Sequence, residues 1–265
     1  MLIPLRLIKI RIFFSLNGIA LTNLPIIELD TVDSTNNYAM RLIDANKAHN
    51  GLTIVAKSQY GGKGQRGRTW VDEPGKSILM TIISSPEMAI GRQFEFNACI
   101  AVAVANVLQK LSDEWHVAIK WPNDIIINDK KAAGILIENI IRGQIWSHSV
   151  IGLGINMHQE GFPPELPFAT SLKIESGTEY DSGDLVVKLQ EAIVAEASRH
   201  RSQEVIFREY NKRLYKRGGR QGFSDQSGKW EAEITDVTPD GALNVKTDGG
   251  EAVKYFHGQV TWDWI

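Results

Sequence analysis

The sequence predicts an α+β protein in which a mixed β-sheet with packed helices is followed by a small all-β barrel. Apolar runs of strand length alternate with helical patterns through most of the chain. The helical pattern at 97–111 is apolar nearly all round, which predicts burial against a sheet. After about Lys216 short apolar runs and turn residues follow one another closely. We therefore expect an α/β domain at residues 26–216 and a β domain at 217–265.

The first expected strand, Ile26–Val32, is followed by Asp33-Ser34-Thr35-Asn36 and a helix that ends near Asn46. Ser34 or Thr35 is a good N-cap for this helix. The hydroxyls and Asn36 have two interpretations: they cap the helix, or they face a pocket. Local sequence alone favours the cap. Two further strands are expected at 52–58 and 77–84, on either side of a glycine-rich segment.

The second half of the α/β domain contains a hairpin signal. A short strand at 117–120 runs into Lys120-Trp121-Pro122-Asn123-Asp124, and Pro122 favours an extended Trp121, so that Asn123 and Asp124 are displayed. Turn residues at 128–129 then separate two apolar runs. Gly134 lies inside the second run, where a glycine suggests close approach of backbone or ligand. The remaining expected elements are strands at 125–127, 131–140, 144–151, 230–237, 242–246 and 252–256, and helices at 184–200 and 203–215.

Composition excludes several classes of protein. The 265 residues carry a formal net charge of −2, whereas general nucleic-acid binding needs a broad positive field. The single cysteine, Cys99, lies in an apolar helical pattern, so neither a disulfide framework nor a thiolate metal site is expected. The histidines are scattered without ligand spacing, and we assign none to a metal. A reduced, cytoplasmic setting follows.

Residues 1–25 are interpreted as an N-terminal extension. Their apolar run is interrupted by Arg6, Lys9 and Arg11, which fits neither a signal peptide nor a membrane span. An additional edge strand, or translation from a start codon upstream of the natural one, explains the run better. There is no room before residue 25 for a helix-turn-helix module, so we expect no DNA-binding domain and no membrane association.

The segment 61–70 is the strongest local signal for a binding site. It holds four glycines together with Lys63, Arg66 and Arg68. Glycines allow backbone N–H groups to approach an anion, and the basic side chains add charge. The segment also matches a dinucleotide fingerprint and nearly matches a P-loop, but both motifs need a helix directly after the glycines. Residues 69–75 cannot begin one convincingly, so both interpretations are rejected.

Taken together, four motifs in their order and spacing resemble the biotin protein ligase family. They are the Asp33–Asn36 turn, the 61–70 loop, Lys120-Trp-Pro-Asn-Asp124 with Lys131-Ala-Ala-Gly-Ile-Leu-Ile-Glu138, and Gly152-Leu-Gly-Ile-Asn156. Lys-Trp-Pro-Asn-Asp is the most specific of them. The resemblance covers the chain from about Ile26 to its end. It implies the family's catalytic domain with a small SH3-like C-terminal domain, in the monofunctional form without a DNA-binding module.

The resemblance implies an ATP-dependent reaction. Biotin is activated as biotinyl-5′-AMP and is then transferred to a lysine of a biotin carboxyl carrier protein or domain. Bringing a carboxylate to a polyphosphate is opposed by charge repulsion, which fixed positive groups reduce. Lys131, Arg66 and Arg68 are therefore the candidate catalytic residues. Mg²⁺ commonly binds through one carboxylate and substrate phosphates, and Asp124 is its candidate ligand.

The remaining candidates divide between two ligands. Biotin needs an apolar slot with a few hydrogen bonds, and the glycines would let strands lie flat against its rings. Trp70 is either a loop anchor or an adenine-stacking residue. The biotin-binding candidates are Ser34, Thr35, Asn36, Gln59, Gly62, Lys63, Gly64, Gln65, Lys131, Gly134, Gly152 and Gly154; those for ATP or the adenylate are Arg66, Arg68, Trp70, Asn123, Lys131 and Asn156.

Two positions depart from the family loop, which usually reads Gly-Arg-Gly-Arg-Arg-Gly-Arg. Lys63 and Gln65 replace two of its arginines, and Gln65 puts retention of the intermediate in doubt. Lipoate or octanoate transfer is the nearest alternative function, and a nucleic-acid-binding module is the alternative from another class. The sequence does not identify the acceptor, and it does not select between monomer and homodimer.

Overall fold

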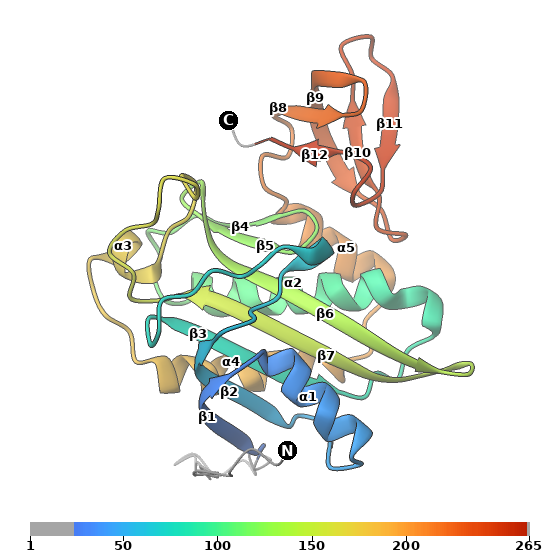
Figure 1. Ribbon diagram of the computed structural model, residues 1–265. Helices are drawn as coiled ribbons and strands as arrows, with labels where there is room; N and C mark the ends of the chain where they lie inside the picture. The colour runs from blue at the N-terminus through green and yellow to red at the C-terminus, as the bar shows by residue number, and fades with distance from the viewer. Residues whose placement is uncertain (1–23, 264–265) are drawn as a thin grey trace.

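The computed structural model describes residues 24–263, which form a seven-stranded sheet with helices and a second, five-stranded sheet (Figure 1). The first sheet has the strand order β1-β2-β3-β7-β6-β5-β4. Its strands are β1 (Ile26–Val32), β2 (Thr53–Gln59), β3 (Ser77–Ser84), β4 (Val117–Lys120), β5 (Asp124–Ile127), β6 (Lys130–Arg142) and β7 (Ile145–Asn156). The helices are α1 (Thr35–Asp44), α2 (Gln93–Gln109), α3 (Leu172–Ser176), α4 (Ser182–Ala197) and α5 (Gln203–Lys212), with short 3₁₀ turns η1 (Gln65–Gly67) and η2 (Ile90–Arg92).

The first sheet is mixed, as predicted. Strands β1 and β2 are parallel and are joined through α1, because a parallel pair needs a crossover. All other neighbouring pairs in this sheet are antiparallel. Strand β7 continues to Asn156, so the Gly152–Asn156 segment lies within a central strand rather than after its end.

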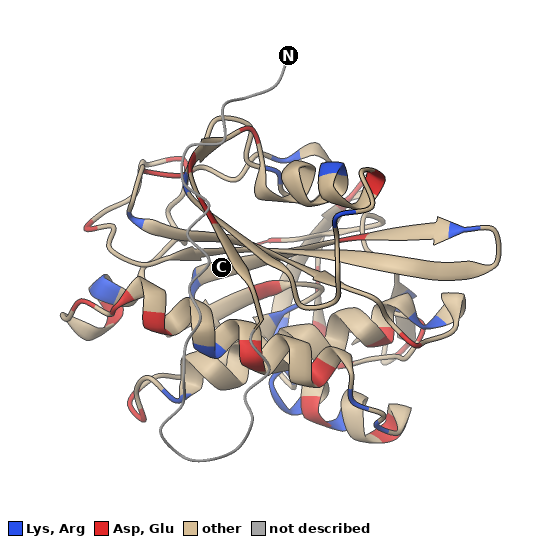
Figure 2. Cartoon of the chain, turned by 90° about the horizontal axis from the view of Figure 1, so that it is seen from below, with Lys and Arg blue, Asp and Glu red and all other residues tan. Residues whose placement is uncertain are grey.

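Two apolar cores lie on opposite faces of the first sheet. Helices α2, α4 and α5 cover one face, and α1 alone lies on the other (Figures 1 and 2). The larger core contains most of the apolar residues of α2, which confirms the burial predicted from its apolar pattern. The smaller core gathers under α1 around Ile43, Ile54, Ile83 and Val150. Because α1 is short, much of its face of the sheet is left for other groups.

The C-terminal residues form an antiparallel sheet with the order β11-β10-β9-β8-β12, which is consistent with the small β domain expected there. Its strands are β8 (Arg220–Asp225), β9 (Gly228–Val237), β10 (Leu243–Lys246), β11 (Ala252–Tyr255) and β12 (Thr261–Trp262). Strands β8 and β12 were not predicted. Strand β8 contains charged and glycine residues, and β12 has two residues, so neither shows a strand pattern.

The remaining sequence expectations concern the first helix, the N-terminal extension and membrane-spanning segments. The predicted helix after Thr35 ends at Asp44, and α3 was not foreseen, since it is a single turn. Residues 1–23, which include most of the expected N-terminal extension, lie outside the described residues. Within residues 24–263, no helix combines the length and apolarity that crossing a membrane requires.

Candidate functional site

A pocket of about 530 Å³ lies on the α1 face of the first sheet and reaches the C-terminal sheet. Successive strand residues point to opposite faces. Val150 packs under α1, so Gly152 and Gly154 face the same side further along β7. Leu79 of β3 and Gly134 of β6 also line the pocket. The pocket therefore occupies the area of this face that α1 leaves uncovered.

The end of the pocket next to α1 is lined by neutral side chains, and a hydrogen-bond network joins Thr35, Asn36, Gln59 and Thr81. Gln59 Oε1 accepts from the Thr35 N–H at 2.7 Å and from the Thr35 hydroxyl at 3.0 Å. The buried Thr81 hydroxyl lies 2.7 Å from Asn36 Oδ1 and 2.8 Å from Thr35 Oγ1. Asn36 Nδ2 donates to Glu138 Oε2 at 2.7 Å. This network fixes the orientation of each amide, which makes this end a rigid recognition surface.

The structure also distinguishes the two interpretations of the Asp33–Asn36 turn. Ser34 has the extended backbone of an N-cap, but its side chain makes no capping hydrogen bond. Thr35 bonds instead to Gln59 and Thr81. The hydroxyls thus serve the pocket wall rather than the helix end. The amide of Asn36 occupies the space where a Cβ on Gly152 would stand, which explains a glycine at that position.

The glycine-rich segment forms a small hairpin over the pocket. Gly64 N donates to Arg68 O at 2.7 Å, Trp70 N donates to Gly62 O at 3.1 Å, and Lys63 and Thr69 form a bridge. At the tip Arg66 adopts φ 55° and ψ 40°, a left-handed conformation that costs a non-glycine residue about 1–2 kcal/mol. Arg68 is extended, and no helix follows. The rejection of the dinucleotide and P-loop interpretations agrees with this geometry.

Trp70 anchors the base of this hairpin to the sheet. A Cβ on Gly154 would lie 2.5 Å from its ring, and a Cβ on Gly134 would lie 3.0 Å from it. These glycines therefore make room for an indole in this structure. Trp70 Nε1 is enclosed and has no hydrogen-bond partner among the described residues. The anchor interpretation describes the observed position, and adenine stacking stays a prediction.

The opposite end of the pocket is charged. Lys131 Nζ lies 2.7 Å from Asp124 Oδ1 and 5.8 Å from the centre of the Trp70 ring. The pairing of β5 with β6 passes from Ile125–Ala133 to Ile126–Lys131, so Ala132 forms a bulge next to Lys131 in β6, and bulges commonly re-aim a side chain. The Lys131 hairpin and the glycine-rich hairpin thus share one pocket. Asn123 also lines it, but its amide is tied to the Ile135 carbonyl.

Lys120 is a buried cation beside this end of the pocket. Its Nζ donates to Trp262 O at 3.0 Å and lies 4.9 Å from the centre of the Trp262 ring. Burial lowers the pKa of Lys120 to about 8, and nearby Asp124 partly offsets this, while Lys131 and Arg68 act in the same direction as burial. A lysine at this depth is expensive to charge, so its position beside other cations indicates a place for anions.

The C-terminal sheet supplies one wall of the pocket. His257, Gly258, Val260, Thr261 and Trp262 line it. Three side chains of the α/β domain donate to backbone carbonyls of this wall region: Lys120 to Trp262, Trp121 Nε1 to Gly241 at 3.1 Å, and Arg66 Nη1 to His257 at 3.0 Å. Partial burial, and then the charges of Arg66 and Arg68, lower the pKa of His257.

The structure brings most of the predicted site residues together. Of the sequence-derived candidates, those that line the pocket are Ser34, Thr35, Asn36, Gln59, Lys63, Gly64, Gln65, Arg66, Arg68, Trp70, Asn123, Asp124, Lys131, Gly134, Gly152 and Gly154. Gly62 and Asn156 do not line it. Gly62 is packed against the Trp70 backbone, and the buried Asn156 donates its amide to Thr170 O at 2.9 Å.

The residues missed by the sequence reasoning are of two kinds. Lys120 and Trp121 stood in the quoted motif, but nothing in the sequence showed that they face the pocket. The C-terminal residues had no signal, since Arg66 and His257 are 191 positions apart. Glu138 also stood in the motif, and its Oε1 lies 3.8 Å from Lys63 Nζ, which joins the neutral end to the loop.

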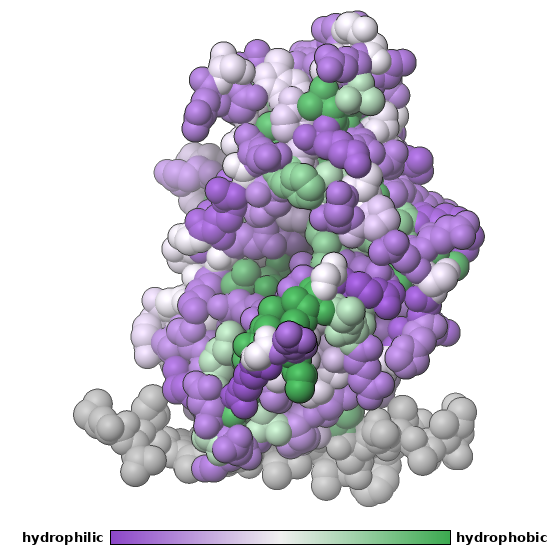
Figure 3. All heavy atoms as spheres, turned by 90° about the vertical axis from the view of Figure 1, so that its right-hand side faces the viewer, coloured by the Kyte–Doolittle hydropathy of each residue, from purple (hydrophilic) through white to green (hydrophobic). Residues whose placement is uncertain are grey.

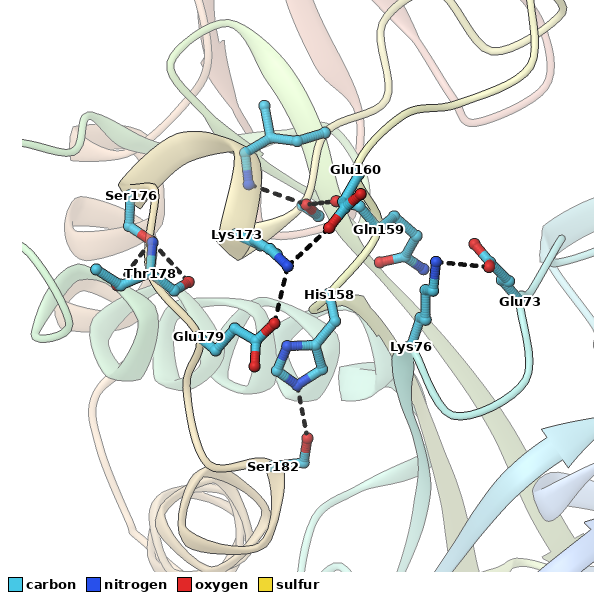
Figure 4. Close-up of polar contacts among 12 residues, drawn as sticks. Glu73, Lys76, His158, Gln159, Glu160, Lys173, Ser176, Thr178, Glu179 and Ser182 are labelled. Atoms are coloured by element: carbon cyan, nitrogen blue, oxygen red, sulfur yellow. Dashed lines mark hydrogen bonds and ion pairs between the residues drawn. The ribbon is translucent and has the colours of Figure 1, made fainter.

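A second polar cluster, next to β7, does not form a metal site. Lys173 contacts Glu160 and Glu179, each at 2.8 Å, while His158 Nε2 lies 3.3 Å from Ser182 Oγ (Figure 4). Glu160 and Glu179 share Lys173, and Glu73 pairs with Lys76, which is the pattern of a surface ion-pair network. Within residues 24–263 no group of three or more histidine, cysteine or acidic side chains has metal-binding geometry.

The residues that form most of this pocket match the model of a known protein family. Residues 28–156 match the model of the biotin/lipoate A/B protein ligase family. These residues include every pocket segment except those from Leu166 and the C-terminal sheet. Residues 28–156 form a biotin/lipoate A/B protein ligase domain. The ligase domain thus ends with β7, and α3 to α5 lie beyond the matched part of the chain.

Individual relatives of the ligase domain agree with this assignment. The chain is 35% identical over 160 residues to the bifunctional ligase/repressor BirA of Bacillus spizizenii, covering 59% of this chain and 49% of that protein. It is 34% identical over 131 residues to the biotin–[acetyl-CoA-carboxylase] ligase of Paracoccus denitrificans, covering 49% of this chain and 53% of that protein. The chain therefore spans about half the length of these curated relatives.

Solved structures extend the likeness of fold beyond the ligase domain. The biotin protein ligase from Aquifex aeolicus in complex with biotin and ATP superposes with a TM-score of 0.75 at 22% identity, covering 91% of this chain and 99% of that one. The enzyme from Leishmania major in complex with biotinyl-5-AMP gives a TM-score of 0.61 at 23% identity, covering 87% and 98%. The C-terminal sheet thus belongs to a shared architecture.

Proposed function

We propose that the protein is a biotin–protein ligase, which activates biotin as biotinyl-5′-AMP and transfers it to a lysine of a biotin carboxyl carrier protein or domain. One observation carries the proposal. A neutral hydrogen-bonded recognition surface and a cluster of four cations, Lys120, Lys131, Arg66 and Arg68, line a single pocket. The family match and the ligands named for the Aquifex and Leishmania structures support the same ligand pair.

The neutral end would hold biotin. Thr35, Asn36 and Gln59 supply fixed donors and acceptors for a ureido group, and Leu79 and Leu136 provide apolar contact. The glycine-rich hairpin lies over this end through Lys63 and Gln65. A pocket that combines apolar walls with a few oriented polar groups is the usual form of a small-molecule site.

The charged end would hold ATP. Lys131, Arg66 and Arg68 reduce the repulsion between the biotin carboxylate and the α-phosphate, most strongly where water is excluded. The bond formed joins a biotin carboxylate oxygen to the α-phosphorus, and the bond broken releases pyrophosphate. A carrier lysine, as the neutral amine, then attacks the acyl carbon; it loses a proton, and AMP leaves.

Mg²⁺ fits the residues at this end. Asp124 is a partly exposed carboxylate within the pocket, and Mg²⁺ commonly binds through one such group, waters and substrate phosphates. When bound, the ion would neutralise phosphate charge. Asp124 pairs with Lys131 in this structure, so it would exchange that partner for the ion.

The finer parts of the proposal concern setting and partners. We propose a cytoplasmic enzyme that acts without DNA, as a monomer or a homodimer. The buried, unpaired Cys99 and the net charge of −2 support a reduced setting and argue against general nucleic-acid binding.

The deciding experiment is incubation with biotin, MgATP and a biotin carrier domain, followed by intact-mass measurement of the carrier. We expect addition of a single biotin. Pyrophosphate release with biotin, lipoate or octanoate in turn discriminates between the acids: a response to lipoate or octanoate alone would refute biotin specificity. A salt-sensitive gel shift with nucleic acid, combined with no pyrophosphate release, would favour the nucleic-acid-binding alternative.

A further inference from the structure

The turn at 256–259 of the C-terminal sheet has a backbone conformation that makes room for the side chain of Arg66. Gly258 has φ +93°, a conformation that side-chain-bearing residues rarely adopt. A Cβ at this position would overlap the guanidinium of Arg66. That guanidinium fills the space left by the missing side chain, and its Nη1 donates to the adjacent carbonyl of His257 at 3.0 Å.

The turn is held in place independently of Arg66. Phe256 N donates to Gln259 Oε1 at 2.7 Å, and Gln259 N donates to Phe256 O at 3.0 Å. The His257 ring packs edge-on against Trp121, with ring centres 5.7 Å apart. Trp121 in turn donates its indole N–H to Gly241 O within the same small domain. The turn is therefore a rigid seat that is already fixed to the ligase domain.

The glycine-rich hairpin, in contrast, has few attachments at its tip. Its hydrogen bonds close the hairpin on itself, and residues 66–69 are exposed. Arg66 is the left-handed residue at that tip, which turns its side chain toward the C-terminal sheet. A hydrogen bond from a charged donor is worth more than one between neutral groups. The Arg66 contact is thus well placed to decide whether the hairpin stays over the pocket.

We propose that Arg66, His257 and Gly258 form a latch that holds the glycine-rich hairpin against the C-terminal sheet and so retains the acyl-adenylate. The inference rests on the proposed function for the identity of the retained molecule. In it Arg66 is a positioning residue that acts through the 256–259 turn, in addition to its charge. The latch requires a glycine at 258 because any side chain there displaces the guanidinium.

The test uses Gly258→Ala, which keeps the charge of Arg66 and removes only its seat. Gly250→Ala is the matched control, since Gly250 has φ +80° in the same domain with only a lysine side-chain atom, 4.0 Å away, near a new Cβ. The readout is the lifetime of enzyme-bound biotinyl-adenylate after free biotin and ATP are removed. We expect loss to be about tenfold faster in Gly258→Ala, the typical weight of a charged hydrogen bond, and unchanged in Gly250→Ala.

A slower adenylation rate with an unchanged adenylate lifetime would overturn the latch. Arg66→Ala against Arg68→Ala gives a second comparison that leaves the C-terminal sheet intact, which matters if Gly258→Ala does not fold. Both variants remove one charge from the same pocket, and Arg66→Ala should shorten the lifetime more than Arg68→Ala, because Arg66 also bonds the 256–259 turn. Equal lifetimes in these two variants would also overturn the inference.

Limited trypsin digestion separates failure of the latch from failure of the proposed function. Cleavage after Arg68 needs no substrate and reports only whether the hairpin opens. We expect faster cleavage in Gly258→Ala than in Gly250→Ala, and equal rates would contradict the latch. If the protein activates neither biotin, lipoate nor octanoate, the proposed function fails while this comparison still decides the inference.

Discussion

The two ends of the pocket are built in opposite ways. The neutral end draws on neighbouring strands and one helix start, and its polar atoms are paired with one another: Thr35 with Gln59, and Thr81 with Asn36. The charged end is assembled from the glycine-rich hairpin, the β4–β6 region and the C-terminal sheet, and it concentrates like charges. The comparison indicates that the neutral end has polar side chains of fixed orientation. The charged end has positive charges that an anionic ligand would neutralise.

Figure 3 shows how hydrophilic and hydrophobic residues are distributed over one face of the molecule. Polar atoms dominate around the hollow between the two sheets, whereas a compact apolar area lies on the face turned to the viewer (Figure 3). The exposed Ile141 of β6 and Ile145 of β7 flank the turn of a hairpin that projects to the right in Figure 1, and neither lines the pocket. The apolar area and the pocket are therefore distinct features of the molecule.

The largest effect is expected from Lys131→Ala. Loss of one fixed positive group beside the reacting phosphate should lower adenylation by about 10²–10³-fold, as for other preorganised electrostatic groups. Biotin-dependent pyrophosphate release is the measurement. Lys130→Ala is the matched control, because Lys130 is the exposed neighbour on the same strand and does not line the pocket. Equal losses of pyrophosphate release in Lys131→Ala and Lys130→Ala would contradict the role of Lys131 at the charged end of the pocket.

A smaller effect is expected at the neutral end from Thr81→Val. The substitution keeps the volume but leaves Asn36 Oδ1 without its buried donor, which costs about 1–3 kcal/mol of the free energy of unfolding. Urea denaturation measures this cost. We also expect weaker biotin binding with an unchanged rate at saturating biotin. If Thr81→Val lowered the adenylation rate but kept the biotin affinity, Thr81 would belong functionally to the charged end of the pocket, which would contradict the prediction.

The pH dependence of stability tests the burial of Lys120. Its folded-state pKa of about 8 lies below the usual 10.5, so the unfolded chain binds more protons between these values. Stability relative to Lys120→Met should therefore rise with pH from about 8 to 10.5, by at most about 1.4 kcal/mol per pH unit. Urea denaturation at pH 7.5 and 9.5 gives the comparison. If the difference in the free energy of unfolding between the two proteins is the same at pH 7.5 and pH 9.5, Lys120 stays charged in the folded protein at both pH values.

The smallest effect is expected at Gln65. Its Oε1 is enclosed without a hydrogen-bond partner among the described residues, and family members usually have an arginine here. Gln65→Arg adds a half-buried cation over the pocket and should reduce escape of the adenylate by about threefold, since a charge that solvent still screens is worth about 1 kcal/mol or less. Lysine labelling of a non-cognate protein measures escape. The isosteric Gln65→Glu should increase it; identical labelling by all three forms would remove Gln65 from the site.

The sequence predicted the ligase domain better than it predicted the pocket wall that the C-terminal sheet supplies. Apolar periodicity located α2, β3 and the β5–β6 hairpin because their burial repeats along the chain. The motif residues Asp124 and Lys131 could be placed in one site by resemblance. The contributions of His257 and Trp262 could not, since a backbone carbonyl gives no pattern in the sequence. Likewise, nothing in the sequence showed that Trp70 would rest on Gly134 and Gly154.

The three donors that join the ligase domain to the C-terminal sheet all end on carbonyl oxygens. Every residue type carries that oxygen, so most of the C-terminal sheet is free to change its side chains without altering how the junction is made. Substitution tolerance should fall sharply at Gly241 and Gly258, where a side chain would meet Phe94 and Arg66, and at His257 and Trp262, whose rings contact Trp121 and Lys120. A foreign β-domain grafted onto this protein would have to reproduce a backbone path, two glycine positions and two aromatic contacts.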